Sequence, residues 1–228
     1  MDHLITNKKG SILAIDADPN STLPQALGTE NHDSIAGICD DVSKHMDSIP
    51  AGMTKERFIE MRIQEAIVEE KGFDLLVMGG PEGPGCYCYV NNLLRDLTAR
   101  VMKNYDFVVI DNAAGMEHIS RRTMRAIDAL LLISDYSIIG IRSARRISEL
   151  VKELGIKVGA SYLVINKVAG SLEPLQDDIR ATGIRFAGAV PYDEGIDKWS
   201  VSNRSIFEFE SPLIRDKIKE IFGNIVER

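Results

Sequence analysis

Short apolar runs recur along the chain, and each one ends in polar residues, glycine or proline. Uninterrupted apolar runs of this length predict buried strands of a parallel sheet. The predicted strands cover residues 11–15, 75–78, 106–111, 130–134, 161–165 and 186–190. The polar groups that follow them are expected at the carboxyl edge of the sheet, where open α/β sheets place their ligands.

Segments with a helical pattern lie between these strands. Helices are expected over Thr54–Glu70, about 91–103, about 140–154, and from Pro212 onward with Ser211 as the N-cap. Residues 21–53 show no pattern that assigns them to a helix or a strand. Alternating strands and helices predict an α/β fold with a mostly parallel sheet and helices on both faces. No linker or repeat interrupts residues 1–228, so we expect a single domain.

Composition narrows the possible environments and partners. The net charge of −7 disfavours non-specific binding to nucleic acid or to anionic lipid. The helix predicted over about 140–154 carries three arginines on one face: Arg142, Arg145 and Arg146. A basic surface exposed to solvent is the favoured explanation of this face. Three cysteines, with no signal peptide, favour a reducing compartment. No apolar run is long enough to span a bilayer. We therefore expect a cytoplasmic protein that binds neither nucleic acid nor membrane.

The stretch from Gly79 to Val90 contains Cys86 and Cys88 and is too rich in glycine and proline to form a helix or a strand. Two thiolates one residue apart favour soft metals such as zinc, copper(I) or nickel, or an iron–sulfur cluster. A tetrahedral zinc site needs four ligands, and two copies of the chain about a two-fold axis would supply four sulfurs. On spacing alone, two reduced thiols in a surface loop are the favoured alternative, because Cys-x-Cys is a weak motif.

Carboxylates follow two of the predicted strands. Asp16 and Asp18 are two residues apart after the first strand, so on an extended segment both face one Mg²⁺ ion or one water molecule. Turn chemistry before a helix is an equally good reading of this pair. Asp111 ends another apolar strand, as in a Walker B motif, where the carboxylate holds Mg²⁺ directly or through water.

Other polar or rigid groups end the last two predicted strands. Asn166 and Lys167 follow one strand, and Pro191, Tyr192 and Asp193 follow the other. Both sets are expected at the ligand edge of the sheet.

Taken together and in this order, these segments resemble the CooC-type accessory ATPases of carbon monoxide dehydrogenase, which belong to the MinD/ParA class of P-loop ATPases. The resemblance spans nearly the whole chain. Its most specific element is the stretch from Met78 to Cys88, because ParA and MinD proteins lack that loop.

The resemblance implies roles for individual residues around ATP or ADP and Mg²⁺. It implies that Asp18 orients the attacking water, Asp16 lies near Mg²⁺ and Asp111 is the Walker B carboxylate. By the same resemblance, the loop from Asn112 to Gly115 senses the γ-phosphate. Asn166 forms a hydrogen bond with the adenine edge, with Lys167 beside it, and the segment from Pro191 to Asp193 packs against the base. Cys86 and Cys88 bind Zn²⁺ or Ni²⁺ across a homodimer. The implied client is a nickel enzyme of the carbon monoxide dehydrogenase type.

The chain departs from this family before Ile12. The family begins with a strand, a glycine-rich phosphate loop and a helix, whereas only eleven residues precede Ile12 and Lys8-Lys9-Gly10 lacks the spaced glycines of a phosphate loop. The family's first strand lies centrally in its sheet, so its loss would expose hydrogen-bonding edges. An internal start codon, a shortened paralogue and a degraded gene product are the competing explanations, of which the first is favoured. We expect this polypeptide alone to lack ATPase activity.

Three functions fit these observations. The leading one is an ATP-dependent maturation factor for a nickel enzyme. The second is a non-catalytic metal carrier or adaptor that keeps the cysteines without the nucleotide. The third is a ParA- or MinD-like positioning ATPase, against which the acidic charge stands.

Overall fold

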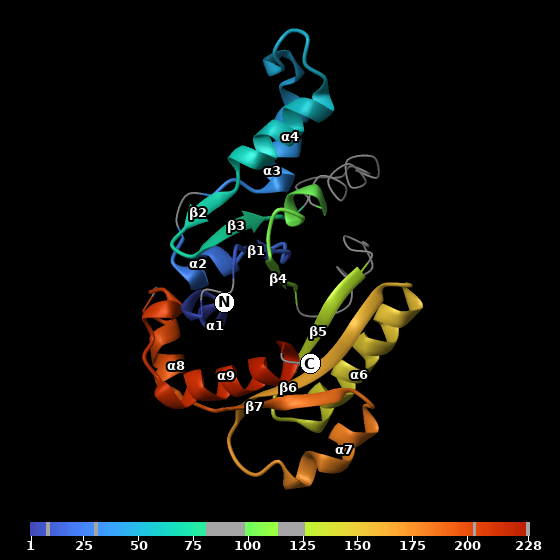
Figure 1. The fold of residues 1–228 in the computed structure, drawn as a ribbon, viewed down its shortest axis with the longest axis vertical. Helices are drawn as coiled ribbons and strands as arrows, with labels where there is room; N and C mark the ends of the chain where they lie inside the picture. Colours follow the sequence, from blue (N-terminus) through green and yellow to red (C-terminus); the bar gives the residue numbers. More distant parts are fainter. Residues whose placement is uncertain (8–9, 30–31, 81–98, 114–125, 203, 227–228) are drawn as a thin grey trace. The chain divides into compact units, whose positions relative to one another are not determined.

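The computed structural model describes residues 1–7, 10–29, 32–80, 99–113, 126–202 and 204–226 (Figure 1). The chain divides into two compact units. Unit 1 contains Met1–Ala114 and Asn203–Glu208, and unit 2 contains Gly115–Ser202 and Phe209–Arg228. Each unit has one sheet with helices packed on it, so the predicted α/β fold with mostly parallel strands is confirmed.

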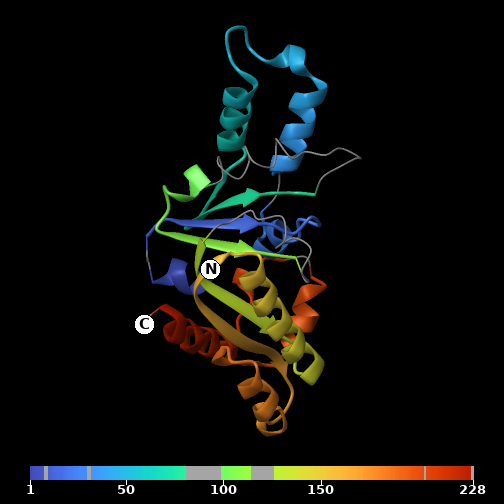
Figure 2. The same ribbon diagram turned by 90° about the vertical axis from the view of Figure 1, so that its right-hand side faces the viewer.

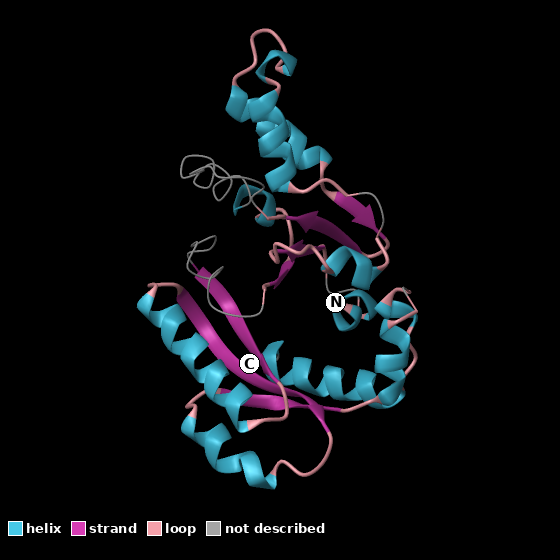
Figure 3. Ribbon diagram, turned by 180° about the vertical axis from the view of Figure 1, so that it is seen from behind, coloured by secondary structure: helices cyan, strands magenta, loops and turns pink. Residues whose placement is uncertain are grey.

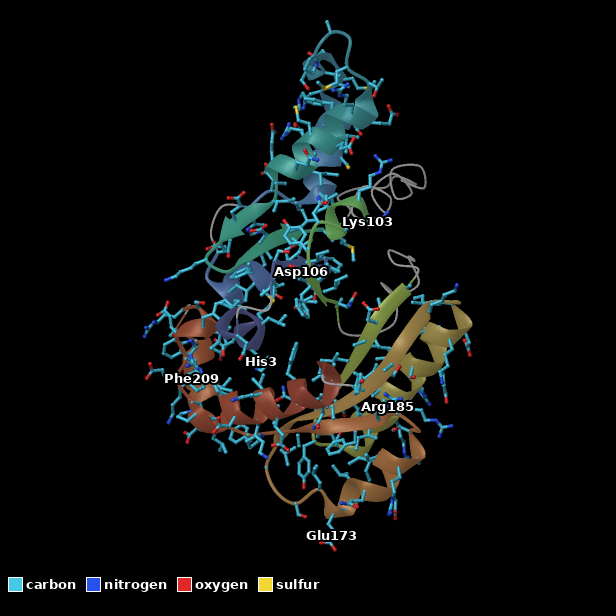
Figure 4. The ribbon with its side chains drawn as sticks, in the orientation of Figure 1. His3, Lys103, Asp106, Glu173, Arg185 and Phe209 are labelled. Atoms are coloured by element: carbon cyan, nitrogen blue, oxygen red, sulfur yellow. The ribbon has the colours of Figure 1, made fainter. Side chains whose placement is uncertain are left out.

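Unit 1 is built on a sheet with the strand order β2-β3-β1-β4. Its strands are β1 (Ile12–Asp16), β2 (Val68–Glu70), β3 (Phe73–Val77) and β4 (Phe107–Asp111). Strand β1 pairs in parallel with β3 and with β4, and all five of its residues are buried. At the amino end of β4, the Asp106 carboxylate accepts hydrogen bonds from the backbone N–H and the hydroxyl of Ser11 (Figure 4), which lower the pKa of Asp106.

The helices of unit 1 bury apolar side chains against this sheet. They are α1 (Asp2–Thr6), α2 (Leu23–Leu27), α3 (Ile35–Lys44) and α4 (Lys55–Glu65), with the 3-10 turns η1 (Met46–Ser48) and η4 (Ile206–Glu208). Helices α3 and α4 lie side by side and extend beyond one end of the sheet (Figures 1 and 2). Their apolar faces share one core with Leu13 and Ile15 of β1 and Leu76 of β3.

Unit 2 is built on three parallel strands in the order β5-β6-β7. The elements are β5 (Ala126–Ser134), α6 (Ile138–Glu153), β6 (Lys157–Val168), η3 (Glu173–Leu175), α7 (Gln176–Ala181), β7 (Arg185–Pro191), α8 (Glu194–Ser200) and α9 (Pro212–Val226). Helices α6 and α7 cover one face of this sheet, and α9 covers the opposite face (Figures 1 and 3). On the α9 side, Leu131 and Ile133 of β5 are 43% and 57% exposed, because α9 packs on β6 and β7.

Most predicted strands and the Thr54 cap are confirmed, and one predicted helix is shorter than expected. The helix predicted over Thr54–Glu70 begins at its expected cap but ends at Glu65, because Val68–Glu70 forms the antiparallel hairpin strand β2 with β3. Gly72, at φ +94°, supplies the turn conformation that this hairpin needs. The segment without a pattern contains α2 and α3. Of the helix predicted over 91–103, residues 91–98 lie outside the described residues, and residues 99–102 are helical.

Each sheet has one protected edge and one open edge among the described strands. Strand β2 is short and charged, and β7 carries register shifts and ends in Pro191, which are features that discourage further pairing. The edges of β4 and β5 are longer runs of apolar residues with no paired strand on their outer side in the described sheets. No described helix combines the length and the apolar character needed to cross a membrane.

Candidate functional site

The turn after β1 is held by the carboxylate of Asp16. This side chain is completely buried, its Oδ1 accepts the N–H of Asp18 at 2.9 Å, and its Oδ2 accepts the N–H of Leu23 at 2.9 Å. Both oxygens therefore bind backbone groups of the turn and of the start of α2. This geometry supports the turn-forming reading of Asp16 more directly than a role as a direct metal ligand.

Asp18 makes a second turn of the same kind. Its Oδ1 accepts the backbone N–H of Asn20 at 2.8 Å and the side-chain amide of Asn20 at 2.9 Å. The side chain is half-buried, whereas that of Asp16 is buried. Asn20 is a partner that we did not single out from the sequence, although an amide two residues after an aspartate is a typical turn signal.

Asp111 faces these carboxylates from the neighbouring strand. It pairs with Asp16 in the parallel register of β1 and β4, and its backbone carbonyl accepts the N–H of Ala17 at 2.8 Å. Partial burial, and then the negative charges of Asp16 and Asp18, raise the pKa of Asp111. Among the described residues, none of the three carboxylates forms an ion pair, so they form a patch of negative potential at the carboxyl end of the sheet.

This patch has the chemistry of a magnesium site that is completed by a ligand. Among the described residues, no group of three His, Cys, Asp or Glu side chains has the geometry of a complete metal site. Mg²⁺ does not require one, because it is typically held by one or two carboxylates, water and phosphate oxygens. Asp111 and Asp18 fit that pattern, since each keeps carboxylate lone pairs that backbone groups do not occupy.

In unit 2, Asn166 and Lys167 lie at a bulge near the end of β6. The register with β7 shifts between Ile165 and Val168, and Lys167 has φ +56°, a conformation that is uncommon outside glycine. The Asn166 Oδ1 accepts the N–H of Lys167 at 2.9 Å, which fixes the side-chain amide at the bulge. Backbone strain of this kind is frequent at ligand sites.

The residues after β7 form a hydrogen-bonded group with α8. Asp193 caps α8, since its Oδ1 accepts the N–H of Gly195 at 2.7 Å and its Oδ2 accepts the hydroxyl of Ser211 at 2.9 Å. The Tyr192 hydroxyl donates to Asp197 at 2.9 Å, and this bond raises the pKa of Tyr192. The ammonium group of Lys167 lies 3.5 Å from the same Asp197 carboxylate. Pro191 is paired with Val168 in the sheet register.

The structure thus groups the predicted site residues in two sets. Asp16, Asp18 and Asp111 meet in unit 1, and Asn112 follows them as an exposed residue. The set in unit 2 consists of Asn166, Lys167, Pro191 and Asp193. Cys86, Cys88 and Gly115 lie outside the described residues. The sequence reasoning missed Asp197, which joins Lys167 to Tyr192, because only the fold brings the ends of β6 and β7 together with α8.

Comparison with known proteins gives a family match and relatives that are matched over most of their length. Residues 3–206 match the family described as the CobQ/CobB/MinD/ParA nucleotide binding domain. An uncharacterized ATP-binding protein of Methanocaldococcus jannaschii is 40% identical, and the match covers 98% of this chain and 90% of that protein. The carbon monoxide dehydrogenase accessory protein CooC of Rhodospirillum rubrum is 26% identical, with 95% of this chain and 86% of that protein covered.

Solved structures agree on the fold. A chain of the MinC:MinD cell division protein complex of Aquifex aeolicus matches with a TM-score of 0.71 at 16% identity, over 100% of this chain and 87% of that one. A ParA family ATPase of Chlorobium tepidum matches with a TM-score of 0.68 at 17% identity, over 97% of this chain and 89% of that one.

Proposed function

Because the chain belongs to the CobQ/CobB/MinD/ParA nucleotide-binding family, we propose that it is an ATP-dependent maturation factor for a nickel enzyme of the carbon monoxide dehydrogenase type. The observation that carries the nucleotide part is the position of Asp111 opposite Asp16, where partial burial and then the negative charges of Asp16 and Asp18 raise the pKa of Asp111. The likeness to CooC over 95% of the chain supports the client class.

In the proposed nucleotide site, each carboxylate has a role that follows from the hydrogen bonds it makes. Asp111 holds Mg²⁺ directly or through water, and Asp18 orients a water molecule toward the terminal phosphate. Asp16 keeps the turn that presents Asp18, since both of its oxygens are engaged by backbone N–H groups. Asn112 and Gly115 follow Asp111 in sequence, and we assign them to sensing the γ-phosphate.

For the base of ATP or ADP we propose the set of residues in unit 2. The side-chain amide of Asn166 is assigned to the adenine edge, and Pro191 to the ring face. Lys167 and Asp193 hold this segment in shape through Asp197 and through the cap of α8. Both units are assigned to one nucleotide-binding domain, because the family match runs from residue 3 to residue 206 and includes residues of both.

The proposed cargo site is the pair Cys86 and Cys88. Two thiolates from each of two chains complete a tetrahedral site for Zn²⁺ or Ni²⁺, which makes a homodimer part of the proposal. In this proposal the metal ion is transferred to the client enzyme, so the thiolate site has to be able to release it.

A non-catalytic metal carrier or adaptor is the second candidate. It rests on the same pair of thiols, and the sequence of residues 1–228 contains no glycine-rich phosphate loop of the Walker A type. In that case the chain binds metal through its thiols but does not bind ATP by itself.

The arginine face of α6 gives little support to a DNA-binding role. Arg142 pairs with Asp178 at 3.1 Å, and Arg145 pairs with Glu149 at 2.9 Å. These contacts neutralise part of the face within unit 2, and the chain is acidic overall. We therefore assign neither DNA nor a membrane surface as a partner.

Nucleotide binding separates the two candidates. Mn²⁺ replaces Mg²⁺ as a paramagnetic probe, and its affinity is measured with and without a non-hydrolysable ATP analogue. The proposal expects binding that weakens at least about tenfold in Asp111→Asn, since a direct or water-mediated ligand is lost. Asp177→Asn is the control, because Asp177 has a side chain that is 92% exposed. No binding of the nucleotide analogue, with thiol-bound metal retained, would select the adaptor instead.

A further inference from the structure

Between α8 and α9, the chain contributes a short segment to unit 1, although the residues on both sides of this segment belong to unit 2. We call residues 204–208 the strap. Its side chains alternate in exposure, with Ser205 and Phe207 half-buried. Arg204 and Glu208 are exposed and form an ion pair, in which the Arg204 Nε lies 3.0 Å from the carboxylate. The half-buried side chains are therefore the ones that can attach the strap to unit 1.

Ser205 and Phe207 contact different elements of unit 1. The Ser205 hydroxyl donates to the backbone carbonyl of Leu27 in α2 at 2.7 Å, and it accepts the N–H of Phe207 at 3.3 Å. The Phe207 ring packs against the buried ring of Phe73 in β3, with 5.7 Å between the ring centroids. Tilted aromatic pairs at this distance attract one another. The strap is thus attached to α2 by a hydrogen bond and to β3 by an aromatic contact.

Helix α2 depends on the contacts at its two ends. It has five residues, and isolated helices of that length are not stable in water. At its start, the N–H of Leu23 donates to the buried carboxylate of Asp16 at 2.9 Å. At its end, the hydroxyl of Ser205 binds the carbonyl of Leu27, which has no partner within the helix. Because Asp16 also binds the N–H of Asp18, α2 joins the carboxylate turn to the strap.

We propose that the strap is a conformational device of the nucleotide site: its docking on α2 holds the turn that presents Asp18, and cation binding at Asp18 and Asp111 favours the docked strap. This inference rests on the proposed function and adds Ser205 and Phe207 to it as positioning residues, since both act through α2. The coupling is reciprocal, so loss of docking weakens cation binding by the same factor by which the cation strengthens docking.

Cleavage by trypsin after Arg204 in the full chain measures how often the strap is open, because a docked segment is cut only while it is released. The products are identified by mass spectrometry, with and without Mn²⁺, and a free reference peptide corrects for changes in trypsin activity. Ser205→Ala is the main variant. Ser202→Ala is the matched control, because the Ser202 hydroxyl donates to the backbone carbonyl of Trp199 at 2.6 Å and not to unit 1.

Without a cation, Ser205→Ala is expected to speed this cleavage by about fivefold, the effect of losing one ordinary hydrogen bond, and Phe207→Ala by more. In the natural chain and in Ser202→Ala, saturating Mn²⁺ is expected to slow it by about fivefold or more. The Mn²⁺ affinity of Ser205→Ala is expected to fall by a similar factor. A strap with a merely structural role would show no response to Mn²⁺.

Three results would overturn the inference. They are unchanged cleavage in both Ser205→Ala and Phe207→Ala, bound Mn²⁺ that leaves cleavage of the natural chain unchanged, and an unchanged Mn²⁺ affinity in both variants.

Hydrogen exchange separates failure of this inference from failure of the proposed function. If Mn²⁺ does not bind at all, the cation part of the proposed function fails, and NMR exchange rates of the Asp18 and Leu23 amides decide whether the strap holds the turn. The Ile15 amide of β1 is the reference for changes in global stability. Exchange about fivefold faster in Ser205→Ala than in Ser202→Ala would support the hold of the strap on the turn, and equal rates would refute it.

Discussion

Replacing Asp16 is expected to lower the stability of the fold, whereas replacing Asp111 is expected to leave it equal or to raise it. Asp16 is completely buried and accepts two backbone N–H groups at 2.9 Å, whereas partial burial and then the charges of Asp16 and Asp18 disfavour the ionised form of Asp111. The sequence places both as acidic residues at the end of an apolar strand. The contribution of each side chain to the free energy of unfolding is set by its hydrogen bonds and not by its position in the sequence.

The loss in Asp16→Ala follows from the two bonds. A hydrogen bond to a charged group contributes about 1.5–3 kcal/mol, and a buried N–H left without an acceptor has a similar penalty. Asp16→Ala therefore lowers the free energy of unfolding by about 3–5 kcal/mol, since relief of repulsion with Asp111 offsets part of the loss. Asp16→Asn keeps one acceptor and lowers it by about 2 kcal/mol. Asp111→Asn is expected to leave stability equal to or above that of the natural chain.

Urea unfolding followed by far-UV circular dichroism, in buffer with a chelator to remove divalent cations, measures these differences. Equal midpoints for Asp16→Ala and the natural chain would refute the assignment of Asp16 to the turn. A destabilised Asp111→Asn would refute the repulsion that we assign to the carboxylate patch.

Four further outcomes are expected. The pKa of Asp111 is raised in the folded state, so the native chain binds this proton more tightly than the unfolded chain does, and stability falls as pH rises through the folded pKa. Any stability gain of Asp111→Asn over the natural chain should therefore vanish below about pH 4, which urea titrations at several pH values will measure. Asp193→Ala removes the cap of α8 and the bond to Ser211, and should lower the unfolding free energy by about 1–2 kcal/mol, whereas an unchanged value would contradict the cap. Thr54→Ala should lower it by about 1 kcal/mol in the same assay. Cys39 should stay unmodified at pH 8 until the chain unfolds, as mass spectrometry of the labelled chain will show.

The strands of the parallel sheets were predictable because each is a short apolar run that ends in polar residues. Helix α3 was also predictable in principle, since Ile35, Ile38, Cys39 and Val42 have helical spacing and Ser34 caps them. Strand β2 was not predictable from its own three residues. They continue a helical pattern, and only their pairing with β3 across Gly72 makes them a strand.

The candidate site was predictable in its residue types but not in their roles. The sequence left Asp16 open between metal binding and turn formation. Its second hydrogen-bond partner, Leu23, is seven residues away, so only the folded turn distinguishes these readings. A Cβ placed at Gly80 would lie 3.1 Å from the Cβ of Pro19, and this approach of segments about sixty residues apart is encoded by no local pattern.

Metal content and native mass of the anaerobically purified chain test the proposed function most directly. The account predicts about one zinc or nickel ion per two chains. It also predicts that metal and dimer are lost together in Cys86→Ser/Cys88→Ser and retained in Cys39→Ala, because Cys39 is buried in the core of unit 1. A metal-free monomer would contradict the bridging thiolate site and the maturation role built on it.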